Sequence, residues 1–225
     1  MPYQTSKERN AIVRAIIFAN GVMKKWPEGF ERSTQGDLII AADGGLNHCK
    51  AWNIKPHVIV GDMDSVDPLM LTAYENQGAE IIRYPSQKNK TDLELAVQAA
   101  ADRDVQEVVI LGALGERWDM TMANLLILTA PLFIDMNVRV LDNGLEVICL
   151  LGHTIRMLEG QPGNTMSLLP IAGPAVGVTL KGFEYPLVKK TLPMGTTRGI
   201  SNIFKREITE IEIESGVLLV VIDRK

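Results

Sequence analysis

The stretch "PHVIVGDMDS" (56–65) combines a short apolar run with two acids directly after it. Its apolar run 58–60 has the β-branched composition of a strand that is covered on both faces. Asp62 and Asp64 follow directly, and side chains two positions apart on an extended chain point to the same side. Both carboxylates are therefore expected to face one point. Two interpretations are open: the acids bind a divalent cation, or they cap the next helix or face water.

The same strand pattern recurs on both sides of this stretch, from residue 11 to about residue 143. Short runs rich in Val and Ile alternate with candidate helices near 66–77, 91–103 and 118–130. This alternation predicts an α/β fold, with a Rossmann-like parallel sheet and right-handed crossovers. The predicted strands are 11–19, 37–43, 56–62, 79–85, 105–113 and 138–142.

The rhythm of the sequence changes after Gly144. Short strand-like runs follow one another, separated by Gly, Pro and Asn, with no amphipathic helix between them. This spacing predicts a small all-β sandwich. We therefore expect two domains, an α/β domain at 1–144 and a β-sandwich at 145–225. The strand-like runs are "LEVICLLG", "HTIRMLEG", "TMSLLPI", "VGVTLKGF" and "GVLLVVID".

Composition limits the class of protein. The 225 residues are 46% hydrophobic and 22% charged, enough apolar sequence for a sizeable core. The net charge of −4 does not suit a protein that coats nucleic acid. The two cysteines, Cys49 and Cys149, lie far apart, which favours a reduced, cytoplasmic protein. The polar N-terminus and the interrupted apolar segment 122–136 predict neither a signal peptide nor a membrane helix.

Further acids occupy the ends of other predicted strands. Asp43 ends the second strand in "AADGG" (41–45), and Asp92 lies just after the fourth in "KNKTDLELAV" (88–97). Ligands of open parallel sheets bind outside the carboxyl ends of the strands. The convergence of acids on this edge favours a metal site. Its predicted members are Asp43, Asp62, Asp64 and Asp92.

The position of Asp92 can be predicted closely. Thr91 and Glu94 have the spacing of a capping box, with Thr91 as the N-cap residue. Asp92 then lies at the first helical position, on the rim of the sheet. A carboxylate favours a helix N-terminus by about 0.3–1 kcal/mol in any case, so this acid taken alone indicates no ligand.

Donors for phosphate are predicted in two places. Gly44 and Gly45 allow the backbone to approach a ligand closely, before the free amides of the next helix. The stretch "LGALGERWDMTMANL" (111–125) repeats this order, with Arg117 before a helix. Its guanidinium could bind phosphate oxygens, or it could face solvent.

His48 is expected on a helix surface rather than as a ligand.

Two ordered sets of motifs run along the chain. The first set is "ADGG" (42–45), "GDMDS" (61–65), "TD.E" (91–94) and "G..G.R.D...AN" (112–124). The second set is "SLLPI" (167–171), "GVTLKGFEYPL" (177–187) and "RGISN" (198–202). The first set resembles the thiamine pyrophosphokinase family, and the second is similar to the thiamine-binding β domain of that family. The resemblance covers nearly the whole chain, in order, apart from the first ten residues.

The resemblance implies a reaction and a set of site residues. The pyrophosphoryl group of ATP would pass to the hydroxyl of thiamine, giving thiamine pyrophosphate and AMP, in a Mg²⁺-dependent homodimer. Asp64 and Asp92 are the better candidates for the proton acceptor, beside Asp62 as a catalytic acid. The thiamine site would comprise Ser201, Asn202 and Tyr185. The ATP site would comprise Asp43, Gly44, Gly45, Thr91, Arg117, Asp119 and Asn124, and the metal site Asp62, Asp64, Asp92 and Asn89.

The sequence departs from the family pattern at two positions. Asn89 stands where the family usually has an acid, and Met120 stands where many members have His. An Asn can still offer one neutral oxygen to a cation, whereas Met donates no hydrogen bond. Either change could be tolerated variation, a shift in nucleotide or metal preference, or a weakening of the enzyme. Because the other acids and the "RGISN" motif are intact, we favour tolerated variation.

Two other functions and one structural expectation follow from the same residues. The chain could be a pyrophosphokinase for another hydroxymethyl heterocycle, such as a pterin, or a module that binds thiamine or a nucleotide without turnover. The thiamine motifs all lie in the β half, and the connection near 143–144 is short. We therefore expect each active site to use two chains of a two-fold dimer.

Overall fold

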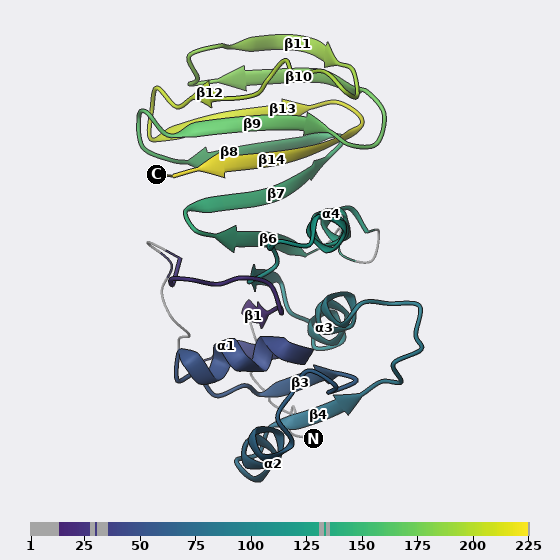
Figure 1. The fold of residues 1–225 in the computed structure, drawn as a ribbon. Helices are drawn as coiled ribbons and strands as arrows, with labels where there is room; N and C mark the ends of the chain where they lie inside the picture. The colour runs from purple at the N-terminus through teal and green to yellow at the C-terminus, as the bar shows by residue number, and fades with distance from the viewer. Residues whose placement is uncertain (1–13, 28–29, 31–35, 131–132, 134–135, 225) are drawn as a thin grey trace, which may run out of the picture.

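One sheet runs through the whole molecule. The computed structural model describes residues 14–27, 30, 36–130, 133 and 136–224. Within these residues, a ten-stranded sheet extends from the α/β half, at the bottom of Figure 1, into the β half at the top. A second sheet of four antiparallel strands packs against its C-terminal strands. A parallel-sheet half followed by an all-β sandwich is the predicted fold class, which is confirmed.

The parallel part of the large sheet has the order β6-β5-β1-β2-β3-β4. Its neighbouring strands are all parallel, and β2 and β3 are buried along their whole length. The first predicted strand begins at residue 11, but residues 11–13 lie outside the described part of the chain. The strands are β1 (Arg14–Phe18), β2 (Leu38–Ala42), β3 (Val58–Gly61), β4 (Glu80–Arg83), β5 (Glu107–Leu111) and β6 (Asn137–Asp142).

Helices cover both faces of this sheet. α1 (Leu46–Ala51) and α2 (Pro68–Asn76) share one apolar cluster with alternate residues of the central strands, such as Ile16. α3 (Asp92–Ala101) shares the cluster on the opposite face with the other strand residues, such as Ile17. α4 (Trp118–Leu126) lies beside it and continues as the 3₁₀ turn η2 (Ile127–Thr129). None of the helices in the described ranges is long and apolar enough to cross a membrane.

The β half is a two-layer sandwich. Four of its strands extend the large sheet in the order β12-β9-β14-β7, and the second sheet has the order β11-β10-β13-β8. Alternate side chains such as Ile148, Met166 and Ile211 meet between the layers. The strands are β7 (Leu145–Leu151), β8 (Thr154–Glu159), β9 (Thr165–Pro170), β10 (Ala175–Lys181), β11 (Leu187–Leu192), β12 (Asn202–Ile203), β13 (Ile208–Ile213) and β14 (Val217–Asp223).

Strands β11 and β13 were not among the predicted runs. β13, "ITEIEI", carries its glutamates at alternate positions that face away from the sandwich core, whereas β11, "LVKKTL", buries only its two terminal leucines. β13 nevertheless lies inside its sheet, between β10 and β8. A strand that buries only one face needs alternation, not a continuous apolar run.

The two halves are joined by a β-hairpin. Asn143 and Gly144 form a two-residue turn with positive φ angles of 46° and 87°, which connects β6 to the antiparallel β7. Arg139 of β6 bridges the junction, since it contacts Glu107 of β5 at 2.8 Å and Glu146 of β7 at 3.2 Å. The predicted boundary at residue 144 therefore falls inside a hydrogen-bonded hairpin and not in a linker.

Candidate active site

A cavity of about 530 Å³ opens at the carboxyl edge of the parallel strands. It lies where the strand order of the sheet reverses. The chain adds β2, β3 and β4 on one side of β1, and then adds β5 and β6 on the other side. Such a switch point is the usual place for a ligand in an open α/β sheet. Polar residues from five segments of the chain line it, among them Asn20, Asp43, Asp62, Lys88, Asp92 and Asn124.

Three carboxylates converge at this edge. Asp43, Asp62 and Asp92 each offer an oxygen within 4.8 Å of the other two. They come from the 3₁₀ turn η1 (Asp43–Gly45) after β2, from the loop after β3, and from the first turn of α3. Gly61 makes the approach possible: a Cβ there would lie 3.0 Å from the Cβ of Asp43 and 3.2 Å from Oδ1 of Asp92.

Asp43 is the most buried member of this acid cluster. Its side chain belongs to a residue only 7% exposed, held at a positive φ of 45°. Its Oδ1 is buried and receives no hydrogen bond from any residue in the described ranges. A buried carboxylate oxygen without a donor is costly, so this atom requires a cation or a donor from a ligand. Three hard carboxylate oxygens fit a divalent cation such as Mg²⁺.

A lysine contacts two of the three acids. Lys88 Nζ lies 3.0 Å from Asp92 Oδ1 and 3.3 Å from Asp62 Oδ2. Burial raises the pKa of Asp92, and the nearby Asp43 and Asp62 add to this, although Lys88 opposes it. The pKa of Asp62 is lowered instead, first by the backbone N–H of Asp64 and then by Lys88. The cluster thus retains like-charge repulsion, which a bound cation would relieve.

Asp64 does not join the cluster. The prediction that it faces the same point as Asp62 is wrong in this structure, because the strand ends at Gly61 and the two-residue period ends with it. The chain turns at Met63, which has a φ of 67°. The side chain of Asp64 is exposed and accepts a hydrogen bond of 2.9 Å from Ser65 Oγ.

The segment before α3 is partly as predicted. Thr91 is the N-cap residue, and its Oγ1 accepts the N–H of Glu94 at 3.2 Å. The carboxylate of Glu94 pairs with Lys90 Nζ at 3.3 Å. Asn89, predicted as a metal ligand, is exposed, and it is not among the residues that line the cavity.

One wall of the cavity is formed by residues that come after β5 in the sequence, in the first turns of α4. Asn124 is buried, and its Nδ2 donates to the carbonyl of Ala113 at 2.7 Å. Its Oδ1 is also buried and has no hydrogen-bond partner among the described residues. Thr121 Oγ1 accepts the N–H of Gly115 at 3.1 Å. Asn124 therefore lines the cavity with one oxygen still available to a ligand.

Arg117 lies on the rim of the cavity and pairs with Asp119. Its Nε and Nη2 contact the two carboxylate oxygens at 3.3 Å and 2.5 Å. This pair lowers the pKa of Asp119. Both side chains are exposed, so the pair is weak and Arg117 can turn to an anionic ligand at little cost. Asp119 is not among the residues that line the cavity.

The two glycines predicted to bind phosphate have a packing role. A Cβ at Gly45 would overlap the carbonyl of Phe18 in β1, and one at Gly44 would overlap the side chain of Asn20. Both glycines let η1 lie against the end of β1 and so bring Asp43 to the cavity. Only glycine, which has no side chain, allows this close approach at the two positions.

Sequence reasoning missed three residues of this region. Asn20 follows β1 as Asp43 follows β2, a signal that could have identified it. Lys88 stands four residues before Asp92 in the motif "KNKTD", the spacing of an ion pair on one helix face. His48 was expected on a helix surface, but it is half-buried, and its Nε2 lies 2.8 Å from the carbonyl oxygen of Gly21. It thereby fixes the chain that follows β1.

The predicted thiamine residues lie in the β half, in two different environments. Asn202 is 2% exposed, and its amide bonds only backbone: Nδ2 donates to the carbonyl of Tyr185 at 2.8 Å. Its Oδ1 accepts the N–H groups of Tyr185 and Ile203, both at 2.9 Å. The side chains of Tyr185 and Ser201 are exposed. Asn202 therefore positions Tyr185, whereas Ser201 and Tyr185 are accessible to a ligand.

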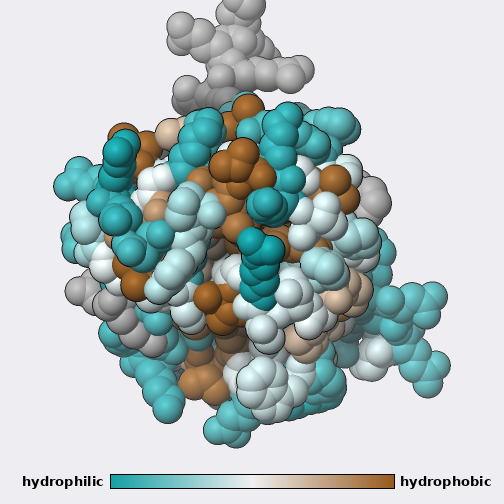
Figure 2. Space-filling model, turned by 90° about the horizontal axis from the view of Figure 1, so that it is seen from above, coloured by the Kyte–Doolittle hydropathy of each residue, from teal (hydrophilic) through white to brown (hydrophobic). Residues whose placement is uncertain are grey.

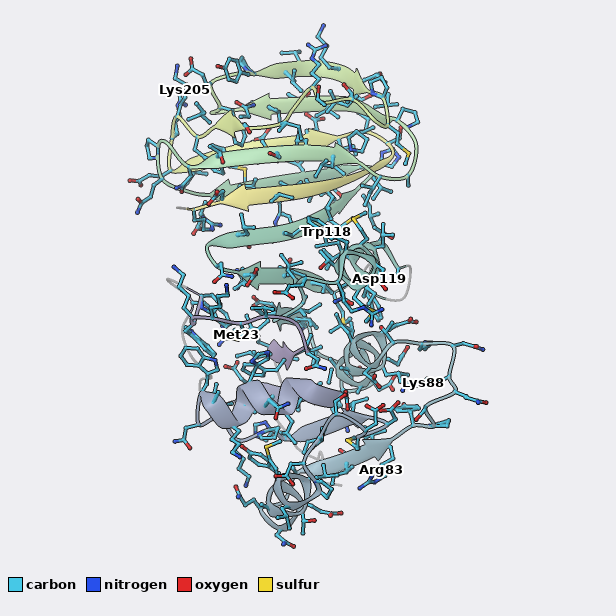
Figure 3. All side chains as sticks on the ribbon, in the orientation of Figure 1. Met23, Arg83, Lys88, Trp118, Asp119 and Lys205 are labelled. Atoms are coloured by element: carbon cyan, nitrogen blue, oxygen red, sulfur yellow. The ribbon has the colours of Figure 1, made fainter. Side chains whose placement is uncertain are left out.

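One chain does not bring the two sets of residues together. β12 and β2 are separated by seven strand spacings in the large sheet, roughly 34 Å along the sheet at about 4.8 Å each. Lys88 marks the acid cluster in Figure 3, in the α/β half, whereas Lys205, three residues after Asn202, lies near the top of the view, in the β half. The cavity is lined only by residues between Ala19 and Asn124.

Comparison with known proteins gives consistent matches along the chain. Residues 32–140 match the family described as "Thiamin pyrophosphokinase, catalytic domain", and residues 152–218 match "Thiamin pyrophosphokinase, vitamin B1 binding domain". Thiamine pyrophosphokinase 1 of Oryza sativa subsp. japonica is 28% identical over 205 residues, which cover 80% of this chain and 77% of that protein. The crystal structure of thiamine pyrophosphokinase from Bacillus subtilis has a TM-score of 0.84 at 23% identity, covers 94% of this chain and 99% of that chain, and shares the fold.

Proposed function

This chain belongs to the thiamine pyrophosphokinase family, and from this premise we propose how its own residues carry out the reaction. The reaction transfers the pyrophosphoryl group of ATP to the hydroxyl of thiamine and leaves AMP. The match of residues 152–218 to a vitamin B1 binding domain argues against a pterin substrate. The intact acid cluster argues against a binding module without turnover.

We propose that Asp43, Asp62 and Asp92 hold Mg²⁺. The observation that carries this proposal is the convergence of three carboxylates within 4.8 Å around a buried, unpartnered oxygen of Asp43. When bound, the ion would neutralise charge on the phosphate oxygens of ATP. Asp64 lies outside the cluster, on the same loop as Asp62, and is the proposed acceptor of the proton from the thiamine hydroxyl.

ATP is proposed to bind in the cavity beside this cluster. Asn124 offers a buried oxygen there, Thr91 lies at the start of α3, and Arg117 lies on the rim. Because phosphoryl-type transfer depends mainly on position and on neutralised charge, these groups need only hold the nucleotide in line with the incoming hydroxyl.

Thiamine is proposed to bind to Ser201 and Tyr185 of the β half, and to meet the ATP of a partner chain. Within one chain, roughly 34 Å of sheet at about 4.8 Å per strand separates the two sets.

Beside the cavity, α4 exposes Trp118, Met122 and Leu126, which lie four positions apart on one helix face. Figure 2 shows apolar side chains interspersed with hydrophilic ones at the β-half end, which suits a mixed interface. A two-fold dimer would join each β half to its neighbour's cavity.

The reaction is tested by incubating the protein with ATP, Mg²⁺ and thiamine and separating the products by chromatography. We expect equal amounts of AMP and thiamine pyrophosphate, and no product in excess EDTA. ADP with thiamine monophosphate would show a different phosphoryl transfer. The absence of any product would favour the binding module.

The shared site is tested by subunit mixing. Asp92→Asn and Ser201→Ala damage different halves, so a mixed dimer would contain one doubly damaged site and one intact site. The assay uses a thiamine concentration at which each variant alone is inactive. Random pairing makes half of the dimers mixed, and activity should return to about a quarter of wild type. If proven mixed dimers recover no activity, both parts of each site belong to one chain.

The roles of the two halves of the chain and the cellular compartment of the protein are also proposals. We propose that 1–144 bind nucleotide and metal, that 145–225 bind thiamine, and that the protein works in the cytoplasm. Both cysteines are free thiols. Burial raises the pKa of Cys49 to about 12 and that of Cys149 to about 11, so both are unreactive thiols suited to a reducing compartment.

A further inference from the structure

Lys88 neutralises two of the three acids of the cluster from within the chain. Its Nζ lies 3.0 Å from Asp92 Oδ1 and 3.3 Å from Asp62 Oδ2, and its side chain is only 12% exposed. The contacts fix an ammonium group among oxygens that belong to the proposed metal site. Lys88 also lines the cavity proposed for ATP.

A metal ion and this ammonium group compete for the same oxygens. Mg²⁺ binds carboxylate oxygens at about 2.0–2.1 Å. An ion on the oxygen that Lys88 contacts at 3.0 Å would lie within about 5 Å of Nζ. Two cations so close in a partly buried site repel each other strongly. Lys88 must therefore leave the carboxylates when the metal binds.

We infer that Lys88 is an internal counter-cation that is exchanged for the divalent metal and then binds the phosphates of the nucleotide. The inference rests on the proposed metal site and adds that the metal binds more tightly once the nucleotide is present. Without nucleotide, the metal must displace Lys88 and binds weakly. With nucleotide, the released ammonium gains a phosphate partner in the same cavity, so metal and nucleotide strengthen each other's binding reciprocally.

Lys90 provides a matched control. It belongs to the same segment, carries the same charge and also lines the cavity. Its Nζ pairs with Glu94 at 3.3 Å, with 43% of the side chain exposed, and does not contact the acid cluster. Lys90→Met therefore removes an equal charge from the segment without freeing Asp62 or Asp92.

The experiment measures the affinity of the full-length protein for Mn²⁺, which takes the same oxygen ligands as Mg²⁺ and is counted by its electron paramagnetic resonance signal when free. We expect Lys88→Met to bind Mn²⁺ alone about tenfold more tightly than wild type, which corresponds to about 1.4 kcal/mol. Lys90→Met should match wild type. Addition of α,β-methylene-ATP should strengthen Mn²⁺ binding in wild type and strengthen it less in Lys88→Met.

The outcomes separate this inference from the proposed function. If wild type binds Mn²⁺, Asp62→Asn binds it poorly, and Lys88→Met binds it no more tightly than wild type, the exchange is refuted while the metal site stands. If wild type does not bind Mn²⁺, with or without the nucleotide analogue, both fail. If Lys88→Met does not fold, Lys88→Gln is compared with wild type in its place, since glutamine retains a polar side chain without the charge.

Discussion

Replacing Asn202 with alanine tests whether this residue positions Tyr185 or recognises thiamine itself. The substitution removes three hydrogen bonds of 2.8–2.9 Å to the backbone of Tyr185 and Ile203. Each contributes a net stabilisation of about 0.5–1.5 kcal/mol. Asn202 is 2% exposed, so the truncation also leaves unfilled volume. We expect the free energy of unfolding to fall by about 2–4 kcal/mol.

The assay is equilibrium urea denaturation, followed by far-ultraviolet circular dichroism, with Ser201→Ala as the control. The Ser201 side chain is exposed, and its backbone N–H, which donates to Ser167 Oγ at 3.0 Å, survives the substitution. Its stability should stay within about 0.5 kcal/mol of wild type. Thiamine binding adds a second readout: Tyr185→Ala should weaken binding in wild type and have little further effect in Asn202→Ala.

A stable Asn202→Ala protein would refute this reasoning. If its unfolding free energy lies within about 0.5 kcal/mol of wild type while thiamine binding is lost, Asn202 recognises thiamine directly. If the effects of Asn202→Ala and Tyr185→Ala on thiamine binding add fully, the two residues act independently and Tyr185 is not positioned by the amide.

Three further predictions concern the acids and the thiamine loop. Asp64→Asn should lower turnover by about a hundredfold or more while thermal stability stays unchanged, because the side chain is exposed; near-normal turnover would remove Asp64 from the chemistry. Burial raises the pKa of Asp92, so its ionised form destabilises the fold at neutral pH, and this loss is relieved as the pH falls and the carboxyl takes up a proton. In EDTA, Asp92→Asn should therefore melt above wild type at pH 7, with the difference vanishing in acid below about pH 4; a lower melting temperature at pH 7 would contradict this. Ser201→Ala should raise the KM for thiamine more than the KM for ATP, and an equal rise in both would mean that the loop only supports the fold.

Features that depend on local pattern could be predicted from the amino-acid sequence. The alternation of apolar runs and helices predicted the parallel sheet, because each element carries its own periodicity. The N-cap at Thr91 followed from the spacing of Thr91 and Glu94, and the structure confirms it. The convergence of Asp43, Asp62 and Asp92 followed from a topological rule, since the carboxyl ends of parallel strands share one edge.

Which side chains meet depends on the way the chain folds in three dimensions. The turn at Met63 carries Asp64 out of the cluster, because backbone dihedrals after a strand end are not set by its period. Lys88 reaches Asp62 across 26 positions of sequence, and the Asn202 amide reaches Tyr185 across 17. No local signal encodes such contacts. The hairpin at Asn143 fuses both halves into one sheet and so holds the residues proposed to bind thiamine far from the acids of the same chain, because neighbouring strands keep a fixed spacing.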